Sequence, residues 1–292
     1  MIDGRRLAYR EVGDHAGCPV IYFHGVPGVR EALVGKPQTY LRAGIRLITL
    51  DRPGYGSSSR NASARVVDVA LDVAQLAVAL GLERYAIVGE SGGGPYALAC
   101  GSLTLRPPSV VVVSSGLAPF DSEGGKLGMK VINRAALRVL PHRALADRSF
   151  RVLSSLFYRW PDFVFDQVLC RNSPTADVEL LRRPDIRLAA KEMLTSTAVS
   201  GIDGVVDDIY RLSHGWGFAF GDIASPVSFW HGDRDNTAPL NQLRHIAGQI
   251  PGSRVTVCPG EGHMVMERHL AEILLLVRGE IERPAESRQH SA

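Results

Sequence analysis

Short runs of apolar residues alternate along much of the chain with longer segments in which apolar residues recur at helical spacing. The short runs predict strands, which we expect at residues 5–12, 19–23, 45–50, 85–88, 110–113, 226–230 and 254–257. The longer segments predict helices within residues 31–42, 66–80, 92–100, 240–249 and 265–278. This alternation is typical of an α/β fold, in which helices cover both faces of a mostly parallel sheet.

The alternation is interrupted in the middle of the chain. Residues 120–223 are mostly helical segments broken by prolines, and strand-like sequence returns only near residue 226. We therefore expect a core of residues 1–119 and 224–282 that is interrupted by a helical cap, or lid, at 120–223. The polar residues 283–292 are expected to form a disordered tail.

The composition is that of an ordinary globular protein, and it argues against several function classes. The 292 residues carry a formal net charge of +3, with Lys and Arg spread along the chain, so we expect no nucleic-acid partner. The four cysteines form no C-x-x-C pair that would indicate a zinc or dithiol site, and we predict no metal.

The first residues, 1–6, turn polar at once and lack the apolar stretch of a signal peptide. No run in the sequence approaches the roughly 18 apolar residues that a membrane span needs. We expect a cytoplasmic protein without stable membrane insertion. The sequence leaves its oligomeric state open.

Gly89-Glu90-Ser91-Gly92-Gly93 matches the pattern G-x-S-x-G between a predicted strand and a predicted helix. Such a turn projects the Ser91 hydroxyl from the carboxyl edge of the sheet, and it crowds positions 89 and 93, where glycine avoids a collision. We predict that Ser91 is a nucleophile on a strained turn. A surface serine in a glycine-rich turn would give the same five residues, so the assignment of Ser91 as a nucleophile depends on finding a base and an acid to accompany it.

A serine hydroxyl becomes an effective nucleophile only beside a base, and a histidine base is held in place by a carboxylate. After a turn of this kind the chain order is serine, acid, histidine. His263, in a small loop after the last predicted strand, is the predicted base, and Asp235 is the predicted acid. We expect Asp233 to brace its own turn through backbone amides, and Asp121 is a third candidate for the acid.

Two backbone N–H groups are needed to hold the negative charge that develops on the substrate oxygen. Gly92, directly after the nucleophile, is the first predicted donor, and Val26, in the loop after the strand 19–23, is the second. His24 lies in the same loop, and we interpret it as a structural residue that makes hydrogen bonds beneath the loop.

Five motifs in this order resemble those of the α/β-hydrolase family: HGVPG at 24–28, DRPGYGSS at 51–58, GESGG at 89–93, HGDRDNTAP at 231–239 and GEGH at 260–263. The resemblance covers roughly residues 4–119 and 224–280. It implies an eight-stranded sheet with a helical cap inserted after the sixth strand, the triad Ser91, Asp235 and His263, and the oxyanion hole Val26 and Gly92. Either the first strand is reduced to a stub around Ile2, which leaves seven strands, or the true start codon lies upstream.

Relatives of this fold that carry aspartate at the nucleophile position are excluded by Ser91, which points to acyl transfer. We predict a serine hydrolase that cleaves the carboxylic ester, or a related acyl bond, of a small-to-medium apolar substrate through an acyl-enzyme, without a cofactor. A proline-iminopeptidase-like aminopeptidase, a thioesterase, a cofactor-free perhydrolase and a carbon–carbon bond hydrolase would use the same triad. A ligand binder without catalysis is a further alternative.

The cap sequence holds a cluster of aromatic residues, among which Phe157, Trp160 and Phe163 are the predicted substrate-binding residues. Alternatively, these residues simply pack the cap against the core. A peptidase would also need acidic cap residues to hold a substrate amine, for which the sequence offers Glu123, Glu179 and Glu192.

Overall fold

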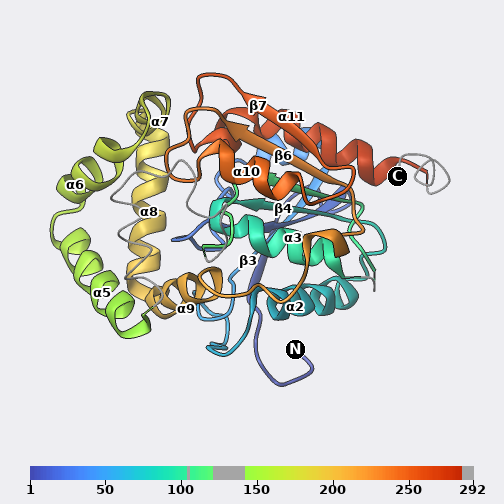
Figure 1. The fold of residues 1–292 in the computed structure, drawn as a ribbon, viewed down its shortest axis with the longest axis horizontal. Coiled ribbons are helices and arrows are strands. Elements are labelled where there is room, and N and C mark those ends of the chain that lie inside the picture. Colours follow the sequence, from blue (N-terminus) through green and yellow to red (C-terminus); the bar gives the residue numbers. More distant parts are fainter. Residues whose placement is uncertain (104–105, 121–141, 285–292) are drawn as a thin grey trace.

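The predicted strands assemble into one seven-stranded sheet in a computed structural model, which describes residues 1–103, 106–120 and 142–284 (Figure 1). The strands are β1 (Tyr9–Gly13), β2 (Cys18–Phe23), β3 (Ile45–Leu50), β4 (Ala86–Glu90), β5 (Val110–Ser114), β6 (Val227–Gly232) and β7 (Arg254–Cys258). Their order in the sheet is β1-β3-β2-β4-β5-β6-β7. Only β1 runs antiparallel to its neighbour, so the prediction of a mostly parallel α/β sheet is confirmed.

Alternate residues of each strand face opposite layers of helices, as the two-residue period of a strand requires. On one face, Ile21, Ile87 and Val111 pack against α2 (Val66–Ala79), α3 (Gly94–Ser102) and α10 (Leu240–Ala247). On the other face, their neighbours Val20, Ala86 and Val110 pack against α1 (Pro37–Ala43) and α11 (Val265–Glu282). All five residues of β5 are buried, as expected for a run of valines covered on both faces.

The start of the chain departs from the predicted pattern. The first strand begins at Tyr9 rather than Arg5, because the backbone N–H groups of Arg6 and Ala8 donate to the hydroxyls of Ser59 and Ser58 instead of to a strand. Residues 1–4 form a turn closed by a hydrogen bond from Gly4 N to Met1 O. No strand precedes β1 within the described residues, so the alternative with seven strands is the one observed.

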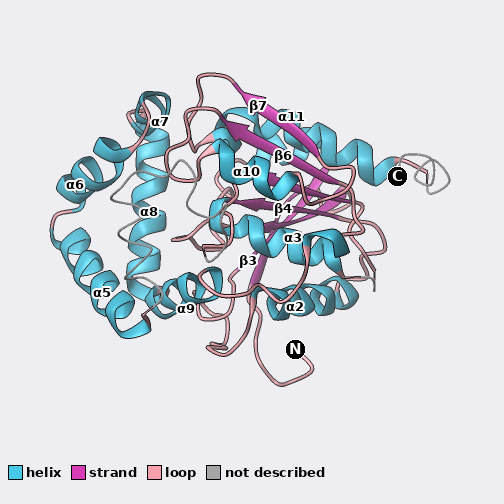
Figure 2. Ribbon diagram, in the orientation of Figure 1, coloured by secondary structure: helices cyan, strands magenta, loops and turns pink. Residues whose placement is uncertain are grey.

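The helices of the insertion lie between β5 and β6 in sequence. In space, most of them lie beside the carboxyl ends of the strands, at the left of Figures 1 and 2. We call the segment from α5 to α9 the inserted helices. They are α5 (Arg143–Arg159), α6 (Pro161–Val164), the π-helical turn η3 (Phe165–Leu169), the short turn η4 (Cys170–Asn172), α7 (Thr175–Leu181), α8 (Pro184–Ser200) and α9 (Ile202–Leu212). Residues 121–141 and 285–292 lie outside the described residues, so the predicted cap boundary at 120 and the predicted tail stay predictions.

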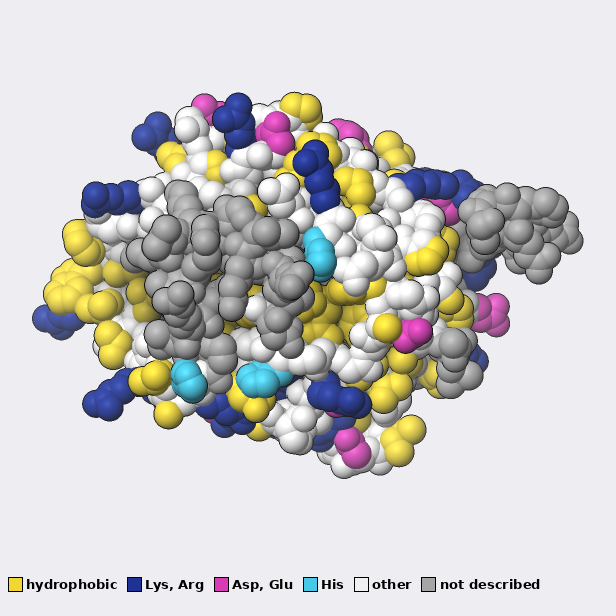
Figure 3. Space-filling model, in the orientation of Figure 1, with side chains coloured by type: hydrophobic (Ala, Val, Ile, Leu, Met, Phe, Trp, Pro, Cys, Tyr) yellow, Lys and Arg dark blue, Asp and Glu magenta, His cyan; other side chains and the backbone are white. Residues whose placement is uncertain are grey.

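No helix within the described ranges combines the length and the apolar character that crossing a membrane requires. On the face shown in Figure 3, basic and acidic side chains are interspersed around the outline. Large apolar side chains of the inserted helices, including Val152, Tyr158 and Phe163, are exposed to solvent.

Candidate active site

The turn between β4 and α3 has the strained geometry that the G-x-S-x-G pattern predicts. Ser91 begins the short turn η1 (Ser91–Gly93) with a φ of +51°, a left-handed conformation that is uncommon for residues other than glycine. A Cβ atom on Gly89 would lie 2.5 Å from the carbonyl oxygen of Gly93. A Cβ atom on Gly93 would lie 2.3 Å from the carbonyl oxygen of Phe23. Both glycines therefore leave room for backbone atoms that pass close by.

The structure brings the side chains of Ser91, His263 and Asp235 into one hydrogen-bonded row. His263 Nε2 lies 2.8 Å from Ser91 Oγ, and His263 Nδ1 lies 2.7 Å from Asp235 Oδ2. The three residues follow the strands β4, β7 and β6, whose carboxyl ends meet at the same edge of the sheet. This row can carry a proton from the hydroxyl to the imidazole while the carboxylate fixes the imidazole ring.

The Asp235 carboxylate is fixed by its own turn. Its Oδ1 accepts the backbone N–H groups of Thr237 and Ala238 at 2.8 and 2.9 Å, which leaves Oδ2 for His263. Asp233 instead accepts the N–H of Gly260 at 2.7 Å, so our expectation that Asp233 braces its own turn is wrong. Asp233 ties the two loops together because Gly260 lies in the loop of the base. Asp121 lies outside the described residues.

The charges of the row stabilise one another. Burial raises the pKa of Asp235, but the attraction of His263 and the hydrogen bonds that Asp235 accepts outweigh this and hold the pKa below its ordinary value. Burial likewise lowers the pKa of His263, but the Asp235 carboxylate, followed by Asp177 and Glu90, outweighs it and raises the pKa above the ordinary value. Glu90, the residue before Ser91, accepts a hydrogen bond of 2.5 Å from Tyr22 Oη.

The loop after β2 lies directly against Ser91. A Cβ atom on Gly25 would lie 3.4 Å from Ser91 Cβ, and a Cβ atom on Gly92 would lie 3.3 Å from the backbone nitrogen of Val26. The Val26 and Gly92 amides are thus close neighbours beside the serine. Gly92 is also in the first turn of a helical segment, where N–H groups lack acceptors within the helix and favour negative charge.

Arg52 holds the loop after β2 in place. Its guanidinium donates to the carbonyl oxygens of His24 and Gly25, the latter at 3.0 Å. It also donates from Nε to Asp208 of α9 at 2.7 Å, and both side chains are fully buried. Asp208 therefore connects the inserted helices, through Arg52, to the loop that carries the Val26 amide.

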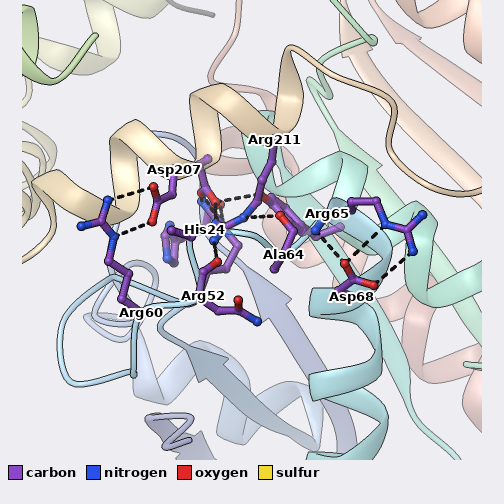
Figure 4. A network of polar contacts seen from close by, with 12 residues as sticks. His24, Arg52, Arg60, Ala64, Arg65, Asp68, Asp207 and Arg211 are labelled. Atoms are coloured by element: carbon purple, nitrogen blue, oxygen red, sulfur yellow. Dashed lines mark hydrogen bonds and ion pairs between the residues drawn. The ribbon is translucent and has the colours of Figure 1, made fainter. Parts of the chain in front are cut away.

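The same carboxylate belongs to a larger network of polar contacts, in which Figure 4 labels Arg52 and Arg211. Asp208 accepts hydrogen bonds from Tyr96 Oη at 2.6 Å and from Arg211 Nη1 at 2.8 Å. Arg211 in turn donates to the carbonyl oxygens of Asn61 and Ala64, as Figure 4 shows for Ala64. Burial raises the pKa of Asp208, but the two arginines and the hydrogen bonds hold it below its ordinary value, so the network is ionised.

His24 has no part in this row of three. Its Nδ1 donates to the carbonyl oxygen of Gly25 at 2.8 Å, and its ring meets Tyr55 edge-on with a centroid separation of 4.8 Å. Burial, together with the nearby Arg52, holds the pKa of His24 well below its ordinary value, so the ring is neutral. These contacts are those of a residue that supports the loop.

The inserted helices line a partly open apolar cavity of about 160 Å³ next to this loop. Apart from Ser154 and Thr197 its lining side chains are apolar, and they are Pro27, Phe150, Leu153, Phe157, Val164, Phe165, Leu169, Leu194, Ala198, Ile202 and Val205. Pro27 directly follows Val26, which places one end of the cavity beside the candidate site. Of the predicted substrate-binding residues, Phe157 lines this cavity, whereas Trp160 and Phe163 are exposed and do not. Glu179 and Glu192 are exposed, and Glu123 lies outside the described residues.

Cys258, Glu261 and His269 form a group, within the described ranges, whose potential metal-binding atoms lie within 4.8 Å of one another. His269 already bonds Glu261 through Nε2 and Glu272 through Nδ1, each at 2.9 Å. Burial raises the pKa of Cys258 to about 11, which disfavours the thiolate that a metal would need. Both ring nitrogens of His269 are thus already occupied by carboxylates.

Sequence reasoning missed two residues that support the site: Asp177, which contacts the backbone of His263, and Asp208, which reaches the loop of Val26 through Arg52. Both lie in the inserted helices, far along the chain from their partners, and no motif marks them. Arg52 did fall inside a recognised motif, at 51–58, but the motif gave no indication that its partner would be a carboxylate of α9.

The sequence model of the alpha/beta hydrolase family matches residues 20–274. A non-heme chloroperoxidase from Streptomyces lividans is 34% identical over 93 residues, which are 32% of this chain and 34% of that protein. A probable proline iminopeptidase from Streptomyces coelicolor is 26% identical over 87% of this chain and 77% of its own length. Among solved structures, an esterase from Exiguobacterium antarcticum superposes with a TM-score of 0.70 over 97% of both chains, at 19% identity, which shows likeness of fold alone.

Proposed function

The chain belongs to the alpha/beta hydrolase family, and on this basis we propose that it is a serine hydrolase that cleaves carboxylic esters of small-to-medium apolar substrates. The observation that carries the proposal is the row Ser91–His263–Asp235, with both imidazole nitrogens within 2.8 Å of their partners. A serine that only occupies a surface turn would not require a strained backbone, nor a histidine and a buried carboxylate hydrogen-bonded in a row.

In the proposed reaction, Ser91 Oγ attacks the ester carbonyl carbon while His263 Nε2 accepts the hydroxyl proton. The N–H groups of Val26 and Gly92 stabilise the negative oxygen of the tetrahedral intermediate. When the C–O bond breaks, His263 returns the proton to the leaving alcohol and the acyl group stays on Ser91. A water molecule, deprotonated by His263, then releases the acid and restores the hydroxyl.

The proposed substrate class rests on the apolar cavity. An apolar cavity of about 150 Å³ accommodates a molecule the size of benzene, so the cavity of about 160 Å³ beside Pro27 fits one compact apolar group of the substrate. We propose that the inserted helices act as a cap over the site and that Phe157 contacts this group. A short acyl or aryl group fits this volume, whereas a long fatty chain would have to extend through the open side of the cavity.

Two alternative activities that would use the same triad are compared directly, a perhydrolase and an aminopeptidase, and one relative is named a probable proline iminopeptidase. A perhydrolase would use the same acyl-enzyme with hydrogen peroxide in place of water. An aminopeptidase would need a carboxylate beside the substrate amine. Glu179 and Glu192 are exposed and absent from the cavity lining, which favours the esterase over the peptidase among the described residues.

Hydrolysis of p-nitrophenyl esters from acetate to palmitate, by the wild type and by Ser91→Ala, tests the proposal. We expect an optimum at short acyl chains, and a loss of roughly 10⁴-fold or more in kcat for Ser91→Ala because the row acts as a unit. Peracid formation from a short carboxylic acid and hydrogen peroxide, and cleavage of proline p-nitroanilide, are measured in parallel. Faster turnover of either substrate than of every ester would replace the esterase proposal.

A further inference from the structure

Asp177, in the first turn of α7, reaches from the inserted helices to the loop that carries His263. Its Oδ2 accepts the backbone N–H of His263 at 2.7 Å, and its Oδ1 accepts that of Met264 at 3.1 Å. The side chain is buried, with an exposed fraction of 3% for the residue. A Cβ atom on Gly262 would lie 2.3 Å from Asp177 Oδ2, so the glycine makes room for this carboxylate.

The Met264 amide belongs to the N-cap of α11, and the His263 amide comes one residue before it. The first N–H groups of a helix lack acceptors within the helix, and a carboxylate there gains from both hydrogen bonding and the helix dipole. Such a cap is ordinarily supplied by a residue next to the helix, but here it comes from 86 residues earlier in the chain. The position of α7 therefore determines the backbone position of His263.

Two further contacts attach the same corner to the loops of the acid and the base. Asn236, which follows Asp235, donates from Nδ2 to the carbonyl oxygen of Asn172 in η4 at 3.0 Å. Arg268, in the first turns of α11, donates from Nη2 to the carbonyl oxygen of Ala176 at 2.9 Å. The segment from η4 to α7 thus contacts both loops whose side chains meet at Ser91.

We propose that Asp177 is a positioning residue that acts through His263, because its carboxylate holds the backbone of the base where the imidazole meets both Ser91 and Asp235. This inference rests on the proposed function, in which His263 is the base. It assigns to the inserted helices a part in the reaction itself, beyond that of enclosing the substrate.

The charge of Asp177 also acts on the imidazole. Within the part of the chain that the structure describes, the titratable groups that act most strongly on His263 are Asp235 after β6, Asp177 on α7 and Glu90 at the end of β4, and His231 on β6 also interacts with it. The three carboxylates favour the imidazolium, whereas His231 is buried and its own pKa is lowered. Removing the charge of Asp177 therefore lowers the pKa of His263, and the acid limb of the pH–rate profile moves to lower pH.

The test compares Asp177→Asn with Glu179→Gln, which removes the same charge from an exposed position two residues further along α7. Glu179 lies 3.9 Å from Arg268 Nη2, an exposed ion pair that contributes little, and the bond from Arg268 to Ala176 does not depend on it. We expect Asp177→Asn to lose roughly 10- to 100-fold in kcat on the best p-nitrophenyl ester, since a small misplacement of the base is enough. KM should change little, and the acid limb of kcat should move down by about half a pH unit or more. Glu179→Gln should match the wild type in kcat, in KM and in the position of the acid limb.

Gly262→Ala provides a second approach if Asp177→Asn does not fold. The added methyl group displaces the Asp177 carboxylate without removing a charge from the chain. We therefore expect kcat to fall and the acid limb of the pH–rate profile to move to lower pH, as in Asp177→Asn. The inference is overturned if the kcat and acid limb of a folded Asp177→Asn, or of Gly262→Ala, equal those of Glu179→Gln. A wild type that hydrolyses no ester and whose Ser91 resists a fluorophosphonate would instead overturn the proposed function.

Discussion

The loops at the carboxyl edge of the sheet and the inserted helices contribute to the site in different ways. The loops supply the atoms of the proposed reaction, and each loop is a short motif whose geometry is set locally, such as the turn at Ser91. The inserted helices supply an apolar cavity and two buried carboxylates, Asp177 and Asp208, whose partners lie 86 and 156 residues away. From this difference we propose that the loops determine the chemistry, whereas the inserted helices place the loops and select the substrate.

The largest effect should come from the acid in the loops. We expect Asp235→Asn to lose about 10⁴-fold in kcat, because the amide would favour the wrong tautomer of His263. Asp233→Asn, two residues earlier, is the matched control and should lose less than about tenfold, since it only weakens the bond to Gly260. Steady-state hydrolysis of one ester compares them, and a greater loss in Asp233→Asn would reverse our assignment of the acid.

In the inserted helices the largest effect should fall on stability. Asp208→Ala leaves Arg52 and Arg211 buried without their carboxylate, which costs about 3–5 kcal/mol in the free energy of unfolding. Asp203→Ala on the same helix removes an exposed carboxylate that pairs with Arg151 and Arg60, and should cost less than about 1 kcal/mol. Urea unfolding measures both, and equal costs would show that the buried network adds nothing.

The pH dependence should follow the charges around the base. Hydrolysis needs neutral His263, whose folded-state pKa is raised, so kcat/KM should fall as the pH falls through a value above the ordinary histidine pKa of about 6.5. The slope should be about tenfold per pH unit for one group. A profile measured from pH 5 to 9 checks this, and an acid limb centred below 6.5 would contradict the electrostatic account of the site.

The smallest effect should be on the choice of substrate. Phe157→Ala enlarges the apolar cavity, so the preferred acyl chain should lengthen and the selectivity between neighbouring chain lengths should change by about 1–3 kcal/mol. Trp160→Ala is the control, because Trp160 is half-exposed and does not line the cavity. If Trp160→Ala shifts the chain-length optimum as much as Phe157→Ala, the substrate extends outside this cavity.

Sequence reasoning reached the strands, the turn at Ser91 and the order of the three residues, because apolar periodicity and glycine-rich turns are local signals. It left open whether the sheet has seven or eight strands, since only the structure shows that Met1–Gly4 forms a turn and that no strand precedes β1 within the described residues. It could not distinguish Phe157 from Trp160 and Phe163, because burial within a helical segment depends on its neighbours. Carboxylates such as Asp177 carry no local signal, since what they cap is a distant helix.

The central claim is that Ser91 is a nucleophile activated by His263. Its most direct test is reaction with a fluorophosphonate, followed by mass spectrometry of the intact protein and of its peptides, for the wild type and for His263→Ala. We expect one adduct, on Ser91, that forms at least about 10³-fold more slowly in His263→Ala. An adduct on another residue, no adduct on the folded wild type, or equal rates in the two proteins would contradict the account.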